Sequence, residues 1–235
     1  MRLSSLIPVV LLAGGCADST DDYPVSTNDP VAPSTGSTTT APMLSGRVCV
    51  VTDPRALTTC SATGAGGLVV SAGGAVVQTS ADGTFSIPVP AHPSMTALQI
   101  SGAGIVPTQL PASSAMSSVP VLQSALYQQM IEATGFTVTP GTGAVLASVT
   151  RNGQPVSGVT MTSSPIGGAG PFFDGATATG FTPDATGTRG IVWAPGIAMG
   201  TASLTFRDPQ QGIETTVGGV QVVDGGLTLT DAILE

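Results

Sequence analysis

Few side chains in this sequence could carry out chemistry. The 235 residues include one histidine, three cysteines and no lysine, because all six basic residues are arginines. A chain without lysine has no amine for a Schiff base, a phosphate-binding loop or a Ser–Lys pair. The histidine, His92, stands between prolines in Pro90-Ala91-His92-Pro93. We interpret it as a solvated loop residue rather than a general base.

The carboxylates are more numerous, but their neighbours indicate turns. Two suitably spaced carboxylates would suit glycoside hydrolysis. Several acidic residues here adjoin Gly or Pro, where an Asp side chain commonly bonds its own backbone. The sequence has no Asp-x-Asp run typical of a calcium loop and no Gly-x-Ser-x-Gly motif for a hydrolase nucleophile. We therefore predict a non-catalytic protein with no metal site and no cofactor.

The large aromatic side chains are the remaining candidates for ligand contact, since only 4% of the residues are aromatic. They are Phe172, Phe173, Phe181 and Trp193. Trp193 shares one strand face with Ile191, which favours a place in the core. Phe172 and Phe173 are adjacent on an extended segment, so they cannot both point inward, and one of them is a candidate for exposure. A carbohydrate- or peptide-binding surface around these loops is the alternative function.

The charge balance excludes one class of partner. The formal net charge is −8 at pH 7. Binding to a nucleic acid depends on a basic surface that neutralises phosphates and releases their counterions. With six arginines in the whole chain, no such surface can form, and we predict no nucleic-acid partner.

Composition and periodicity predict a β-rich protein. Hydrophobic residues make up 41% of the chain, which is enough for a core, whereas 31 Gly and 19 Pro interrupt it too often for long helices. Tight hairpins are predicted at Gly73-Gly74 and at Asn152-Gly153, because both turn positions need positive φ. Alternating or apolar runs predict strands at 44–51, 68–71, 75–78, 84–87, 95–101, 105–110, 144–149, 156–161, 189–193, 202–206, 215–223 and 227–234.

One helix is predicted, over residues 119–134. Leu122, Leu126 and Met130 recur there at helical spacing, and Gly135 is a suitable stop. We expect this helix to pack between two β-rich segments.

Residues 1–15 have the features of a signal peptide. Met1-Arg2 precedes an apolar stretch far shorter than the ~20 residues that a membrane-spanning helix needs. The run Leu12-Ala13-Gly14-Gly15-Cys16 resembles the lipobox of bacterial lipoproteins. In that family the cysteine is lipidated and becomes the mature N-terminus, so the resemblance implies that Cys16 anchors the protein in a membrane. Ala17 in place of Asp favours the outer membrane. The alternative is an ordinary secretory signal cut after small residues, which would give a secreted protein.

Residues 16–43 contain mainly Ser, Thr, Pro, Asp and Asn, with almost nothing to bury. We predict a disordered tether here that holds a folded head away from the membrane.

The remaining sequence resembles a known family of β-sandwich modules. In the first segment the resemblance lies in residues 46–51 and 79–87, where a Gly-x-Val strand is followed by Thr-x-x-x-Gly-x-Phe. In the second segment it lies in residues 143–149, 153–159 and 187–192. Both patterns are similar to the carboxypeptidase regulatory-like, transthyretin-related modules. The resemblance implies two tandem sandwiches with a spacer, adhesive or sugar-contacting role on a secreted or surface protein.

Cys49 and Cys60 are predicted to form a disulfide. If Cys16 carries lipid, these two cysteines remain, in an oxidising compartment where disulfides persist. Strand alternation places Cys49 opposite Val48 and Val50, so it need not be a core thiol. The alternative is that the two cysteines are unrelated small buried residues.

Together these features predict a non-catalytic cell-envelope lipoprotein with a structural or interaction role. Its expected partners are a membrane, reached through the lipid anchor, and an envelope polysaccharide or protein. The predicted organisation is a signal peptide (1–15), a lipidated cysteine and tether (16–43), a first sandwich (44–111), a linker with one helix (112–142) and a second sandwich (143–235).

Overall fold

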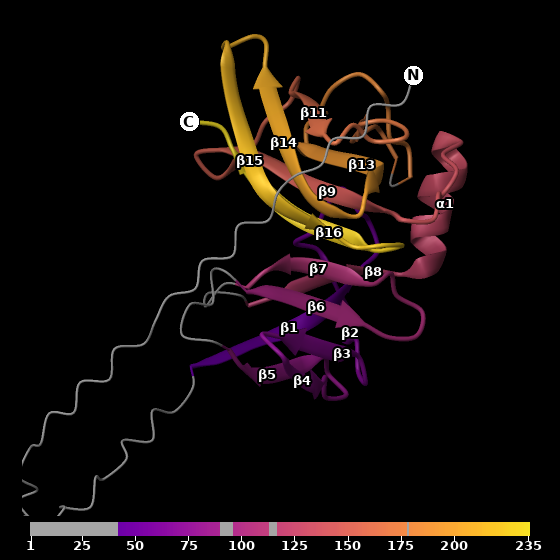
Figure 1. The fold of residues 1–235 in the computed structure, drawn as a ribbon, viewed down its shortest axis with the longest axis vertical. Coiled ribbons are helices and arrows are strands. Elements are labelled where there is room, and N and C mark those ends of the chain that lie inside the picture. Colours follow the sequence, from indigo (N-terminus) through magenta and orange to yellow (C-terminus); the bar gives the residue numbers. More distant parts are fainter. Residues whose placement is uncertain (1–41, 90–95, 113–116, 178) are drawn as a thin grey trace, which may run out of the picture. The chain divides into compact units, whose positions relative to one another are not determined.

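The structure, a computed structural model, describes residues 42–89, 96–112, 117–177 and 179–235. Within these ranges the chain forms sixteen strands and one α-helix, arranged in β-sandwich layers (Figure 1). The prediction of an all-β protein with one helix between two β-rich segments is confirmed. The predicted signal peptide, Cys16, the tether and His92 lie outside the described residues. Below, the first half means residues 42–140 and the second half residues 141–235.

Two sheets divide the strands of the first half between them. In the smaller sheet β1 pairs with β2, β5 and β8, and the order β7-β6-β3-β4 belongs to a larger sheet. The elements are β1 (Met43–Val51), β2 (Cys60–Gly64), β3 (Val69–Ala72), β4 (Ala75–Gln78), β5 (Thr84–Pro88), β6 (Ala97–Ser101), β7 (Thr108–Pro111), β8 (Val119–Leu122) and α1 (Ser124–Thr134).

The second half also contributes to two sheets. The strands β12-β13-β9-β16 continue the larger sheet, with β10 beside β9, while β11-β14-β15 form a separate layer. The elements are β9 (Thr142–Arg151), β10 (Gln154–Pro155), β11 (Thr160–Ser164), β12 (Phe172–Phe173), β13 (Ile191–Ala198), β14 (Gly200–Asp208), β15 (Ile213–Val222) and β16 (Leu227–Ile233).

The larger sheet runs through both halves. Its junction is the parallel pairing of β16 with β7, in which Leu227 lies opposite Thr108 and Thr228 opposite Gln109. On its other side β16 pairs in parallel with β9 over seven residue pairs, from Leu227 with Ala144 to Ile233 with Thr150. The last strand of the second half is therefore an interior strand of a sheet that both halves build.

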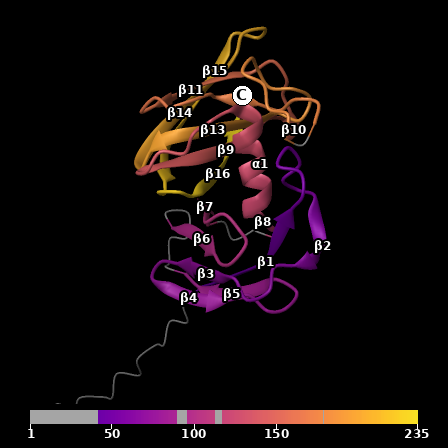
Figure 2. The same ribbon diagram turned by 90° about the vertical axis from the view of Figure 1, so that its right-hand side faces the viewer.

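The helix begins later than its sequence pattern indicates. Val119–Leu122, the first four residues of the expected helix, form the parallel strand β8 against β1. The helix starts at Ser124 and ends before Gly135, which has the left-handed conformation expected of a stop (φ 67°). In Figure 2, α1 lies in front of β9, β13 and β16. The apolar spacing correctly predicted a helix in this region. Its expected first turn instead forms a strand, because β1 offers backbone groups with which these residues can pair.

The predicted hairpin at Asn152-Gly153 forms, with φ values of 50° and 73°. Its return strand differs from the prediction. Only Gln154–Pro155 pair back with β9. Gly158 (φ 80°) then redirects the chain, and the following strand, β11, joins β14 in the other layer. The sequence therefore crosses from one layer of the sandwich to the other, instead of completing a long hairpin.

Candidate functional site

The aromatic side chains gather around Trp193 on β13, which is fully buried. Four rings from separate elements surround the indole, mostly edge to face, an arrangement that favours aromatic pairs. Their ring centroids lie 6.0 Å (Tyr127), 6.4 Å (Phe136), 5.6 Å (Phe172) and 5.7 Å (Phe181) from that of Trp193. The cluster joins α1, the segment after it, β12 and the segment around Phe181 to one face of β13. This is the face that packs on the core shared with the first half.

Phe172 and Phe173 both lie against protein, contrary to the expectation that they cannot both point inward, and Phe172 alone of the two keeps partial exposure. Phe172 is half-buried and packs against the core that contains Trp193, whereas Phe173 is 2% exposed and belongs to the core on the opposite face. The two side chains do point in opposite directions, as the alternation requires. Because both faces of this sheet are covered, both directions lead into protein.

Of the four predicted ligand contacts, the three rings of Phe173, Phe181 and Trp193 are buried. None of these three presents an open ring face to a ligand, and the favoured core position of Trp193 agrees with the structure. Phe172 keeps partial exposure, but its ring lies against the indole. Ligand contact by this group of rings stays a prediction, confined to Phe172.

Two polar groups in the cluster, the Trp193 indole N–H and the Tyr127 hydroxyl, differ from the apolar rings around them. The Trp193 Nε1–H has no acceptor within hydrogen-bonding geometry. The Tyr127 hydroxyl beside it has a pKa raised to about 12, because burial disfavours the phenolate more than the indole stabilises it. Tyr127 is therefore a neutral phenol at physiological pH, with no capacity to act as a general base.

A group of charges links the loop after β1 to the second half. The guanidinium of Arg55 contacts both Asp53 carboxylate oxygens through Nε and Nη2, each at 2.9 Å, and Nη1 donates to the Gly175 carbonyl at 2.6 Å. Arg189 donates to Asp53 Oδ2 at 2.8 Å. The hydrogen bonds and charge of Arg55 lower the pKa of Asp53, so the carboxylate stays ionised. We call Asp53, Arg55 and Arg189 the arginine clasp.

Beside the clasp, the buried carboxylate of Asp174 holds a loop. It accepts backbone N–H bonds from Gly187, Arg189 and Ile191, each 2.9 Å long. A Cβ on Gly187 would lie 2.5 Å from the Asp174 carbonyl oxygen, so glycine is needed for this close approach. The Asp174 carboxylate therefore fixes the backbone that leads into β13, the strand that places Trp193 in the core.

Two more carboxylates stabilise turns. Asp208 accepts hydrogen bonds from Arg151 and from the backbone of Gln210, and these interactions lower its pKa. Bonds from Ser80 and Thr84 lower the pKa of Asp82 to about 2. The turn interpretation of these acidic residues agrees with their contacts.

The predicted disulfide pair lies on neighbouring strands. β1 and β2 are antiparallel, with Val51 opposite Cys60 and Cys49 opposite Gly64. Cys49 is 2% exposed, because β8 and β2 flank this end of β1, so the thiol position is in the interior. The pairing of Cys49 with Cys60 stays a prediction, since the side chain of Cys60 is outside what the structure describes.

Two kinds of feature are absent from the described ranges. No helix in them is long and apolar enough to cross a membrane. No group of three or more His, Cys, Asp or Glu side chains in these ranges is arranged to hold a metal ion.

Comparisons with known proteins place the chain in no family. No family model matches it, and a search of curated proteins found no similar sequence. The solved structures that are distantly similar include two pilins and the TIE protein. GBS52, the minor pilin of Streptococcus agalactiae, is 10% identical with a TM-score of 0.29, covering 82% of this chain and 94% of that chain. The Bacillus anthracis TIE protein is 11% identical with a TM-score of 0.25, covering 83% and 34%. The shaft pilin SpaA of Lactobacillus rhamnosus GG is 11% identical with a TM-score of 0.22, covering 83% and 97%. Similarities at this level support no functional argument.

Proposed function

We propose that this protein is a non-catalytic component of the bacterial cell envelope, attached to a membrane through a lipidated Cys16 and serving a structural or interaction role. The outer membrane is the proposed destination. The folded region serves as a head at the end of the predicted tether, and a secreted form is the alternative.

The proposal of a non-catalytic role rests on the contacts of the acidic side chains, which stabilise loops and turns. Asp53, Asp82, Asp174 and Asp208 each accept two or more hydrogen bonds that hold a loop or a turn. The pKa values of Asp53, Asp82 and Asp208 are lowered, and such a carboxylate is a poor general base because it has little affinity for a proton. These contacts support a scaffold whose charges stabilise its loops.

The anchor rests on the sequence around Cys16, which resembles a lipobox and precedes the predicted tether. A single acyl chain binds a membrane only marginally, whereas the several chains of a lipoprotein cysteine give stable attachment. Anchoring and folding would therefore be separable properties of the chain.

The test is Cys16→Ser in the full-length chain, expressed in a bacterium that processes lipoproteins. We expect the wild type in the membrane pellet after a high-salt wash and the variant in the soluble fraction, with the same melting temperature. Ala17→Ser is the matched control and should stay in the pellet. Retention of Cys16→Ser in the pellet would contradict the anchor, and release of the wild type would favour the secreted form.

A further inference from the structure

A cleft of about 550 Å³ opens between the two halves of the described region. This volume is within the range of small-molecule sites, which often lie between domains. One wall comes from the first half and the other from β9 and β16. The lining includes Leu57, Thr58, Ser148, Leu229, Thr230 and Asp231.

In the wall formed by β9 and β16, the polar residues lie just beyond the part of the sheet that the first half covers. Along β16, Leu227 and Leu229 face the core shared with the first half, and alternation puts Asp231 on the same face. Along β9, Leu146 has the same orientation, and so does Ser148. The parallel register sets Asp231 directly opposite Ser148. On this face of the sheet, the apolar side chains lie in the core, and the carboxylate of Asp231 and the hydroxyl of Ser148 line the cleft.

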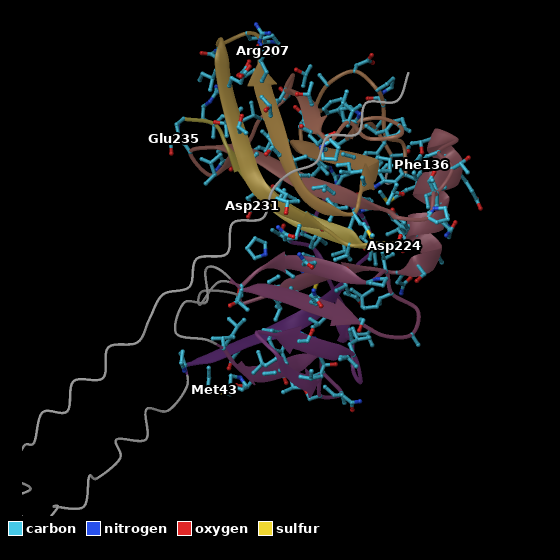
Figure 3. All side chains as sticks on the ribbon, in the orientation of Figure 1. Met43, Phe136, Arg207, Asp224, Asp231 and Glu235 are labelled. Atoms are coloured by element: carbon cyan, nitrogen blue, oxygen red, sulfur yellow. The ribbon has the colours of Figure 1, made fainter. Side chains whose placement is uncertain are left out.

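The Asp231 carboxylate makes no hydrogen bond and no ion pair among the described residues. Asp231 is exposed to solvent at the cleft. It lies near the C-terminal end of β16 (Figure 3). The surrounding protein raises its pKa, because burial disfavours the ionised form. The other described carboxylates with shifted pKa values, Asp53, Asp82 and Asp208, accept hydrogen bonds, so Asp231 is the exception among them.

The rest of the lining shows what would complement this charge. Around Asp231 are the hydroxyls of Thr58, Ser148 and Thr230 and a floor that includes Leu229, and no lining residue is basic. A single carboxylate is too few ligands for a divalent cation in a protein site. A primary ammonium group needs one carboxylate and several neutral oxygen acceptors, and this lining supplies both.

We propose that the cleft binds a small ligand carrying one primary ammonium group beside hydroxyl or amide groups, held by Asp231 and Ser148. The ammonium pairs with the carboxylate, the neighbouring polar groups bond the hydroxyls, and the ligand skeleton lies on the leucines. An amino sugar and a lysine side chain share this chemistry. The assignment goes beyond the proposed envelope role and does not depend on it.

The experiment is calorimetric titration of the full-length Cys16→Ser chain with three probes. D-glucosamine tests the amino sugar, Nα-acetyl-lysine amide tests the peptide source, and D-glucose is the neutral match for glucosamine. We expect at least one ammonium probe to bind and glucose to bind at least about tenfold more weakly, since a hydrogen bond to a charged group has roughly that value. Tighter binding of glucosamine identifies a sugar ligand, and tighter binding of the lysine derivative identifies a peptide.

Asp231→Asn should weaken binding of the ammonium probe about tenfold or more while leaving the melting temperature equal or higher, because it removes a charge that the fold disfavours. Ser148→Ala is a second, milder variant in case Asp231→Asn misfolds. Glu214→Gln removes an exposed strand carboxylate outside the cleft and should change nothing.

Three results would overturn the assignment: no binding of either ammonium probe, binding of glucose as tight as that of the tighter ammonium probe, or unchanged binding in both cleft variants. None of them affects the envelope proposal, which the membrane fractionation of Cys16→Ser tests separately.

Discussion

The two halves of the molecule differ in how they complete their cores. Among the described residues, the core between β9, β13 and the β11-β14-β15 layer contains only residues of the second half, such as Val149, Phe173 and Phe206. The other core joins most of the buried apolar residues of the first half to a set from the second, including Leu146 and Trp193. The second half therefore encloses one core within its own chain, whereas the first half needs its neighbour to close the other. The difference shows that similar turn and strand patterns do not make equivalent folding units.

Separating the halves should give the largest effect. We expect residues 141–235 to fold alone, with a cooperative melt but a lower melting temperature than the full chain, because one sheet face loses its cover. Residues 42–140 should give no cooperative melt, since part of their core is missing. Circular dichroism melts of both fragments test this. A cooperative melt of 42–140, or none for 141–235, would reverse the comparison.

Trp193→Ala should reveal the shared core most directly. In the full chain we expect a loss of about 3–5 kcal/mol in unfolding free energy, the usual cost of truncating a buried large aromatic side chain. In the fragment 141–235 the cost should be much smaller, because the rings of Tyr127 and Phe136 are already absent. Phe206→Ala is the matched control, and its cost should be similar in both chains, since its core lies in the second half. Chemical denaturation measures all four values.

The predicted Cys49–Cys60 disulfide should stabilise the half that cannot close its core. Closing a loop of about a dozen residues lowers the conformational entropy of the unfolded chain, which stabilises the folded state by about 3 kcal/mol or slightly less. Reduction should therefore lower the melting temperature of the full chain, through its first half, and leave the fragment 141–235, which has no cysteine, unchanged. Thiol titration of unfolded, unreduced Cys16→Ser protein should find no free thiol. Two freely titrating thiols would contradict the disulfide.

Asp53→Asn should give the smallest of these effects, because the clasp is partly open to solvent. We expect a loss of about 1–3 kcal/mol at neutral pH, since the buried Arg55 keeps its charge without its partner. The folded-state pKa of Asp53 is below the unfolded value of 3.8, so its contribution is present above that pH and disappears as the pH falls through the folded value. The difference between wild type and variant should thus shrink below about pH 4.

Denaturation of both proteins between pH 2 and pH 7 measures this dependence. Asp184→Asn, which changes an exposed loop carboxylate with no ion pair among the described residues, is the control and should show no comparable difference. A constant difference at every pH would show that Asp53 acts through packing rather than through its charge.

Local signals account for the elements that the sequence predicted well. Alternation placed β1, β3, β4, β15 and β16 within a residue or two of their observed bounds. The Asn152-Gly153 turn and the stop at Gly135 depend on backbone conformations that few residues adopt without strain, so their positions are visible in the sequence. The core position favoured for Trp193 followed from its face on β13.

The predictions from sequence were wrong where a segment pairs with a strand that is distant in the chain. Val119–Leu122 has helical spacing but forms a parallel strand with β1, and the strand expected at 156–161 was displaced to the other layer. Phe172 was open to two assignments because nothing in its neighbours tells whether one or both sheet faces are covered. The unpartnered carboxylate of Asp231 gave no sequence signal at all, since its neighbours resemble those of any strand.

The amino-acid sequence was sufficient for the all-β class, the turns, most strand positions and the exclusion of lysine chemistry, because each depends on residue types or on contacts a few residues apart. The pairing of β16 with β7, the double cover over Phe172 and Phe173, the arginine clasp and the cleft at Asp231 were decided by folding of the whole chain. They join residues as far apart as Asp53 and Arg189, and such contacts depend on which surfaces remain uncovered after the local elements have formed.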